Sequence, residues 1–345
     1  MKNNDYKKDW MNFDQFKAKY QKVSVSEYPN NVLESMPEPK VSVLLITYQH
    51  KEYFRDAMES VLMQQTDFPF EIVIGDDDST DGTRELCIEY AQKYPGKIRC
   101  FLHKNENKIK VLDKPSANFQ WIYGLFSLRG AYIAFLSGDD YWTDPHKLQK
   151  QYDFLSNNPE YSMCNHPQKK LAVMNFVPEH RIKRHGKIRS SSGIITILAR
   201  NICQQLPYQY TEVINEDTFL VFILSTHGVS KCIDTISPAV YRVHGESMFS
   251  STAYLERRNH KANCCEKIYE VFKNSPYRKA AIKKKISAIN IRRSYLFRTK
   301  NDNQKPESLG RFALQLHREG LLFEYIKVDL RKKMVETLRR IKRVF

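Results

Sequence analysis

The chain has 345 residues, 41% of them hydrophobic and 27% charged, with a formal net charge of +16 at pH 7. A chain of this length exceeds what one compact core usually absorbs, so we expect a main domain with appended elements. No stretch approaches the roughly 18 uninterrupted apolar residues of a membrane-spanning helix, and the opening MKNNDYKKDWMNFDQ has no apolar signal core. These features argue against a spanning helix and a secretory signal, and they favour a cytoplasmic location.

The seven cysteines stand singly, except for the neighbours Cys264 and Cys265, and no C-x-x-C pair suggests zinc. We therefore expect reduced and mostly buried thiols. The basic excess is confined to one end of the chain: residues 251–345 hold 25 Lys and Arg against 9 Asp and Glu, whereas residues 1–250 hold 30 of each.

Short apolar runs alternate with amphipathic stretches from Val41 onward. The runs predict strands at 41–47 (VSVLLIT), 70–75 (FEIVIG), 97–103 (KIRCFLH) and 131–137 (AYIAFLS). Apolar residues at helical spacing predict helices over residues 51–65, 83–94 and 118–128. Continuous apolar strands alternating with helices are typical of βαβ units, so the sequence predicts an α/β domain whose mostly parallel sheet is covered on both faces.

Three regions follow from this pattern. Residues 1–40 form an aromatic-rich amphipathic arm that ends at the prolines of SMPEPK. Residues 41–250 form the α/β domain. Residues 251–345 form a basic helical extension, with amphipathic helices expected at 279–297 and 331–345 on either side of the breaker NDNQKPESLG.

Polar clusters follow the predicted strands directly. They are Thr47 and Tyr48 after the first strand, Asp76 to Asp78 after the second, and Ser137 to Asp140 after the fourth. Ligands of open parallel sheets bind beyond the carboxyl ends of the strands, so we expect these clusters along one rim. Several carboxylates on one rim need a compensating cation, and their oxygens suit Mg²⁺ or Mn²⁺ carrying substrate phosphates.

A purely structural interpretation is open for each cluster alone. Asp and Ser after strands form Asx turns, and Asp81 and Asp144 both stand where helix-capping residues would. The joint placement of the clusters favours a ligand site over separate turns.

These residues resemble the family 2 glycosyltransferases of the GT-A fold. VSVLLITYQ resembles the family's V-S-V-I-I-P-T-Y-N, EIVIGDDDSTDGT resembles E-I-I-V-V-D-D-G-S-T-D-G-T, and GAYIAFLSGDDYWTDP resembles the strand bearing the D-x-D element. The similarity is dense over residues 40–155 and weaker to about residue 250. It implies a GT-A-type nucleotide-sugar-binding domain at 41–250.

Carried over by position, the resemblance implies that Thr47 and Tyr48 line the nucleotide pocket, with the tyrosine ring against the base. Asp77 would accept a hydrogen bond from uracil. Asp139 and Asp140 match the D-x-D region, where one would bind the metal through the diphosphate and the other would support ribose or the metal; which does which is left open.

Two departures from the family pattern stand out. Ile46 replaces a frequent proline, and Ser137 stands where the family usually has the first acid of D-x-D. The missing charge predicts weaker metal binding and leaves open a transferase that has lost activity.

The second half of the domain implies the chemistry. INEDTFL offers the pair Glu216 and Asp217 on the acceptor side, with Asp217 as the general base that takes the acceptor proton and Glu216 beside the acceptor or sugar. A helix-capping role for Asp217 is the alternative. YRVHGES at 241–247 places Arg242 for phosphate and His244 for the metal or diphosphate, and a structural role is equally open for this histidine.

Trp142 could form a wall of the sugar site, although a tryptophan beside a strand end is as easily part of the core. The resemblance as a whole implies an inverting, metal-dependent transferase, using Mn²⁺ or Mg²⁺, that moves a sugar from a UDP-sugar to a glycan or lipid-linked acceptor in cell-envelope polysaccharide assembly.

The basic helices at the end of the chain suit an anionic membrane surface, which would place the protein at the inner face of the cell membrane. A solvated helical face or a dimer contact is also open. The rival hypothesis is a nucleic-acid-binding α/β protein, but no reading motif accompanies the charge and we expect no nucleic acid partner. A dinucleotide-dependent oxidoreductase is disfavoured because no G-x-G-x-x-G follows the first strand.

Overall fold

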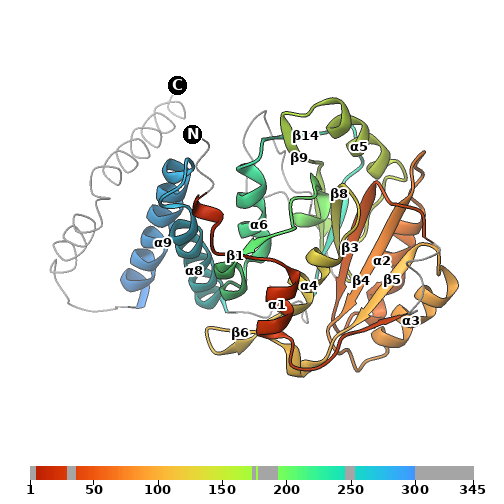
Figure 1. Cartoon of the computed structure of the whole chain (residues 1–345), viewed down its shortest axis with the longest axis horizontal. Helices are drawn as coiled ribbons and strands as arrows, with labels where there is room; N and C mark the ends of the chain where they lie inside the picture. Colours follow the sequence, from red (N-terminus) through yellow and green to blue (C-terminus); the bar gives the residue numbers. More distant parts are fainter. Residues whose placement is uncertain (1–4, 29–35, 173–175, 178–192, 245–252, 300–345) are drawn as a thin grey trace. The chain divides into compact units, whose positions relative to one another are not determined.

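The computed structural model describes residues 5–28, 36–172, 176–177, 193–244 and 253–299. The chain divides into two compact units, one of residues 7–253 and the other of residues 1–6 with 254–345. Figure 1 shows the chain.

An eight-stranded sheet forms the centre of the larger unit (Figure 1). Its strands, in spatial order, are β14 (Val229–Cys232), β9 (Tyr161–Asn165), β12 (Leu198–Arg200), β8 (Tyr132–Ser137), β3 (Val41–Thr47), β4 (Phe70–Asp76), β5 (Ile98–Leu102) and β2 (Ser26–Tyr28). The four predicted strands are β3, β4, β5 and β8, which are adjacent and parallel, and each observed end lies within one residue of its prediction. The predicted α/β fold is therefore confirmed.

The remaining strands complete the sheet at its two sides. β12 pairs antiparallel with both β8 and β9, β14 runs parallel to β9, and β2 closes the other edge antiparallel to β5. Smaller sheets join β11 (Phe176–Val177), β10 (Gln168–Ala172) and β15 (Ala239–Val243), then β1 (Trp10–Met11) with β13 (Leu206–Pro207), and β6 (Lys110–Val111) with β7 (Lys114–Pro115).

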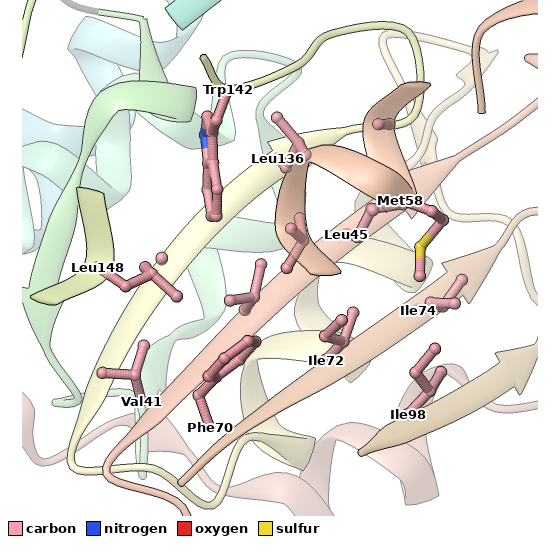
Figure 2. Close-up of a cluster of buried hydrophobic side chains, with 14 of the residues drawn as sticks. Val41, Leu45, Met58, Phe70, Ile72, Ile74, Ile98, Leu136, Trp142 and Leu148 are labelled. Carbon is pink, nitrogen blue, oxygen red and sulfur yellow. The ribbon is translucent and has the colours of Figure 1, made fainter. Parts of the chain in front are cut away.

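Helices cover both faces of the central strands because alternate strand residues point to opposite sides. On one face, Leu45 and Ile74 pack in a buried cluster with side chains of α2 (Lys51–Leu62), α3 (Thr83–Lys93) and α5 (Lys147–Asn157). Figure 2 shows part of this cluster, with Met58 of α2 and Leu148 of α5. On the other face lies α4 (Asn118–Ser127), whose Trp121 ring stacks on Phe135 with centroids 5.4 Å apart.

From residue 7 onward, the N-terminal arm belongs to the same compact unit as the sheet. Its helix α1 (Phe13–Tyr20) begins with a capping box between Asn12 and Gln15, and Phe16 lies against Phe119 of α4 at a centroid distance of 5.3 Å. Together with β2 at the sheet edge, this segment extends the domain that we expected to begin at Val41.

The smaller unit contains α8 (Tyr254–Phe272) and α9 (Arg278–Thr299), which pack through Ala262 and Cys265 against Ala288 and Ile291. The helix predicted at 279–297 is thus confirmed, whereas the breaker at 301–310 and the helix predicted at 331–345 lie outside the described residues. None of the helices in the described part of the chain has the length and apolar character needed to cross a bilayer. All seven cysteines are free thiols, as predicted.

Candidate functional site

The ends of β3, β4 and β8 meet at one level of the sheet. The parallel register pairs Thr47 with Asp76 and Ile46 with Ser137. Past the strand ends, the Asp77 amide donates to the Thr47 carbonyl at 3.1 Å, and the Gly138 amide donates to the Ile46 carbonyl at 2.8 Å. The acidic clusters therefore converge on Thr47, and the structure brings them together on one rim as the sequence predicted.

Asp76 has a structural role at this rim. Its side chain is fully buried, and Arg84 of α3 donates from Nε to its Oδ2 at 2.6 Å. The same guanidinium lies 3.3 Å from Asp78, a residue at φ 67° in the left-handed region. Arg84 thus neutralises the two outer acids of the cluster, leaving the middle one for a ligand.

Lys108 contacts both Asp77 and Tyr48 beside this pair. The Asp77 side chain is buried, and the Lys108 ammonium lies 3.2 Å from its Oδ2. Burial raises the pKa of Asp77 to about 6, with Lys108 acting in the opposite direction. Tyr48 is 45% exposed, and the Lys108 ammonium lies 4.3 Å from its ring centroid. An exposed ring beside a hydrogen-bonding carboxylate suits a planar base.

Asp139 lies with two histidines at the end of β8. His244 Nε2 is 3.1 Å from Asp139 Oδ2, and His50 Nε2 is 3.8 Å from the same oxygen. The other ring nitrogen of His50 lies 3.2 Å from the hydroxyl of Thr47. Gly138 has no room for a side chain because a Cβ would overlap the Thr47 hydroxyl and lie 2.9 Å from His50 Nδ1.

Asp140 has a different partner. Its Oδ1 accepts the backbone N–H of Arg242 at 2.8 Å, which ties β15 to the end of β8. Burial, and the neighbouring Asp139 charge, raise its pKa well above the ordinary value. The Arg242 guanidinium is itself engaged, because it donates to the Asp139 carbonyl at 3.2 Å, pairs with Asp56 and lies 4.5 Å from the Tyr141 ring centroid. Asp139 is thus the acid of the pair that is placed to meet a ligand.

Asp139 and His244 fit a divalent cation that takes only part of its shell from protein. The two atoms that could bind the metal, Asp139 Oδ2 and His244 Nε2, lie 3.1 Å apart. The other ring nitrogen of His244, Nδ1, is buried without a hydrogen-bond partner. Within the described residues, no group of three or more His, Cys, Asp or Glu is arranged to hold a metal. Mg²⁺ typically takes one or two protein carboxylates and completes its shell with water and phosphate oxygens, so this small donor set is consistent with such an ion.

Glu216 and Asp217 lie in the first turn of α6 (Glu216–Ser225). The turn is anchored to α4, because Trp121 donates to the Tyr210 hydroxyl at 2.7 Å and this hydroxyl donates to the Glu216 carbonyl at 2.9 Å. Burial raises the pKa of Glu216 to about 8, so it keeps its proton at neutral pH. Asp217 is half-buried, and its Oδ1 accepts the N–H of Thr218 at 2.6 Å. Of the two acids, Asp217 is better suited to accept a proton.

The interpretation of Trp142 as a wall of the sugar site is wrong. Its side chain is 1% exposed, its indole N–H donates to the Ile195 carbonyl at 2.8 Å, and the buried Lys147 ammonium lies 3.9 Å from its ring (Figure 2 shows its place in the core). Asp144 does not directly precede its helix, since α5 begins at Lys147. Its carboxylate instead accepts the N–H groups of His146 at 2.9 Å and Ser237 at 3.0 Å.

Sequence reasoning missed three residues of this site: Arg84, Lys108 and His50. Only His50 carried a usable signal, because it follows the Thr47 strand end closely. Arg84 lies on a helix and Lys108 on a loop. Only the folded structure brings these two side chains to the rim, so the sequence did not reveal them.

Comparisons with known proteins agree with this architecture. The family model described as glycosyl transferase family 2 matches residues 42–208. An uncharacterised protein of Mycobacterium tuberculosis is 32% identical over 231 residues, which cover 63% of this chain and 62% of that protein. The putative teichuronic acid biosynthesis glycosyltransferase TuaG of Bacillus subtilis is 34% identical over 119 residues, covering 34% of this chain and 42% of TuaG.

Among solved structures, Staphylococcus aureus TarS 1-349 in complex with UDP-GlcNAc superposes with a TM-score of 0.51 at 16% identity, covering 86% of this chain and 92% of that one. At this identity the superposition shows a shared fold, which is of the GT-A type. Residues 42–208 therefore form a domain similar to those of glycosyltransferase family 2. The match spans 62% of the length of the mycobacterial relative.

Replacing Arg84 by alanine tests whether the ion pair of Asp76 and Arg84 stabilises the fold. Arg84→Ala leaves the fully buried Asp76 carboxylate without its cation, so we expect a loss of about 3 kcal/mol in the free energy of unfolding, measured by urea denaturation. Arg55→Ala removes an exposed pair with Glu89 and should change stability little. Equal losses for the two variants would contradict this assignment.

Proposed function

We propose that the protein is an inverting, metal-dependent glycosyltransferase. It transfers a sugar from a UDP-sugar to a glycan or lipid-linked acceptor in cell-envelope polysaccharide biosynthesis. The observation that carries the proposal is the convergence, at the ends of three parallel strands, of the exposed Tyr48 ring and the Asp77 carboxylate with the side chains of Asp139 and His244.

The donor would lie along this rim. Uracil packs on the Tyr48 ring and gives its N3–H to Asp77, and Thr47 lines the pocket between the strand ends. Asp139 and His244 would hold Mn²⁺ or Mg²⁺ against the diphosphate. The bound ion supplies charge stabilisation for the departing diphosphate. Support for a uridine nucleotide comes from the fold relative TarS, whose structure contains UDP-GlcNAc.

The transfer step needs a base on the acceptor side. Asp217 takes the proton of the acceptor hydroxyl as this oxygen attacks the anomeric carbon and the bond from that carbon to the diphosphate breaks. The proton moves to the Asp217 carboxylate, and the configuration at the anomeric carbon inverts. Glu216 stays protonated at neutral pH and so can donate a hydrogen bond to the acceptor or the sugar.

The acceptor class is supported by TuaG, whose name places it in teichuronic acid biosynthesis. An anionic membrane surface is the partner proposed for the basic C-terminal helices, at the cytoplasmic face of the membrane. Apolar residues of α9 pack against α8, so this contact would be electrostatic.

The Asp217→Asn variant distinguishes an effect on the rate of sugar transfer from an effect on UDP binding. The amide cannot accept the acceptor proton, so release of UDP from UDP-sugars in the presence of Mn²⁺ should slow by about 100-fold or more, measured by a coupled UDP assay over a donor panel. Calorimetric affinity for UDP should stay within about twofold. Asp234→Asn, an exposed acid outside this helix, serves as the control. Full activity of Asp217→Asn excludes Asp217 as the base.

The pH dependence of UDP binding reports on Asp77. The carboxylate is the form that accepts N3–H, and its pKa of about 6 means that this form is present above pH 6 and is lost as the pH falls. Calorimetry from pH 5 to 8 should show UDP affinity falling by at most about tenfold per pH unit below 6. Asp77→Asn keeps an acceptor oxygen at every pH, so this component should disappear. An unchanged pH profile in the variant argues against uracil at Asp77.

A further inference from the structure

The N-terminal arm, residues 7–28, precedes the region at 42–208 that matches the family model, yet it packs within the same compact unit (red in Figure 1). Its helix α1 is anchored on α4 by aromatic contacts. The ring centroids of Phe13 and Tyr123 lie 4.9 Å apart, and those of Phe16 and Phe119 lie 5.3 Å apart. The arm is therefore fixed to the helix that also anchors the first turn of α6.

The arm contacts the chain both before and after α6. β1 pairs with β13, which places the fully buried Met11 opposite Leu206. Near the end of α6, the Lys7 ammonium lies 3.4 Å from Nε2 of His227. The arm thus brackets residues 206–227, the segment that contains the two acids proposed for the acceptor side.

Between these contacts, Tyr20 of α1 reaches the short 3₁₀ helix η5 (Tyr208–Glu212). The hydroxyl oxygens of Tyr20 and Thr211 lie 2.9 Å apart. The buried Thr211 hydroxyl donates its own hydrogen to the Tyr208 carbonyl at 2.9 Å, so Tyr20 is the donor in the bond between the two hydroxyls. The Lys19 ammonium also lies 4.5 Å from the centroid of the Tyr208 ring. Two neighbouring side chains of the arm therefore hold η5.

η5 leads directly into α6, and α4 holds the connection. The fully buried side chain of Asn118 donates to the carbonyls of Thr211 and Val213 at 3.0 and 2.7 Å, and the Tyr210 hydroxyl bonds to the first turn of α6. The backbone that leads to Asp217 is thus held by α4 and, at Thr211, by the arm.

The first turn of α6 depends on such contacts from outside the helix. Helix ends fray, and the side chain of the N-cap residue Asn215 makes no capping hydrogen bond here. A general base must stay within hydrogen-bonding distance of the proton that it takes, and a displacement of about 1 Å can cost roughly 100-fold in rate. Asp217 lies in this turn, so a shift of η5 would move its carboxylate.

We propose that Tyr20 is a positioning residue, which holds Asp217 in place for proton abstraction through its hydrogen bond to Thr211 of η5. This inference rests on the proposed function, in which Asp217 is the base. Tyr20 acts through Thr211 and not on the substrate. The arm thereby takes part in building the acceptor side of the site.

The test uses the full chain and changes single hydroxyl groups. Tyr20→Phe should lower kcat for UDP release from UDP-sugars, with Mn²⁺ present and water as the acceptor, by about 5- to 20-fold. The KM for the donor and the calorimetric affinity for UDP should stay within about twofold. Thr211→Val should act like Tyr20→Phe, whereas Thr211→Ser keeps the hydroxyl and should retain most of the activity.

Tyr28→Phe is the matched control. It makes the same change on the same arm, where the hydroxyl accepts from Gln92 of α3, and it should leave kcat unchanged. The double variant Tyr20→Phe with Thr211→Val should be no slower than the slower single variant, because both changes remove the same bond. Hydrogen exchange followed by mass spectrometry should show faster exchange of amides in residues 208–219 for Tyr20→Phe and not for Tyr28→Phe.

The outcomes separate this inference from the proposed function. If the unchanged protein releases no UDP from any UDP-sugar, the proposed function is wrong and the inference fails with it. If the unchanged protein is active and Tyr20→Phe keeps both its kcat and its exchange rates at residues 208–219, the inference alone is overturned. An equal loss of kcat in Tyr28→Phe also overturns it, since the effect would then be a general loss of stability.

Discussion

The parallel register of β8, β3 and β4 is the constraint on which the site depends. It brings Ile46 level with Ser137 and Thr47 level with Asp76, so the chain leaves all three strands at one height. A shift of one residue would turn every core side chain to the wrong face, and the buried apolar cluster therefore enforces the register. The ligand rim is in this sense a consequence of how the sheet packs.

Acids that converge on one rim need compensating partners, and three of them have different ones. Asp76 is buried against Arg84, Asp77 against Lys108, and Asp139 against His244. The first pair is closed by burial and serves the fold. In the other two pairs, a ligand can displace the partner of the acid or bind beside it. One cluster can therefore contain both structural and ligand-binding carboxylates.

Much of the fold could be predicted from the sequence because the four central strands are continuous apolar runs whose ends are marked by polar residues. β12 and β9 could not, because their places depend on antiparallel pairings far along the chain. The convergence of the acids was predictable from strand order. Lys108 was not, because tertiary contacts place its loop, and Trp142 was misassigned because a tryptophan after a strand can face either the core or a cleft.

A crystal structure with UDP and Mn²⁺ tests the central claim most directly. The account predicts an anomalous manganese peak within bonding distance of Asp139, a diphosphate beside it, and uracil stacked on the exposed Tyr48 ring. A nucleotide bound away from the ends of β3, β4 and β8, or a manganese ion held by other residues, would contradict it.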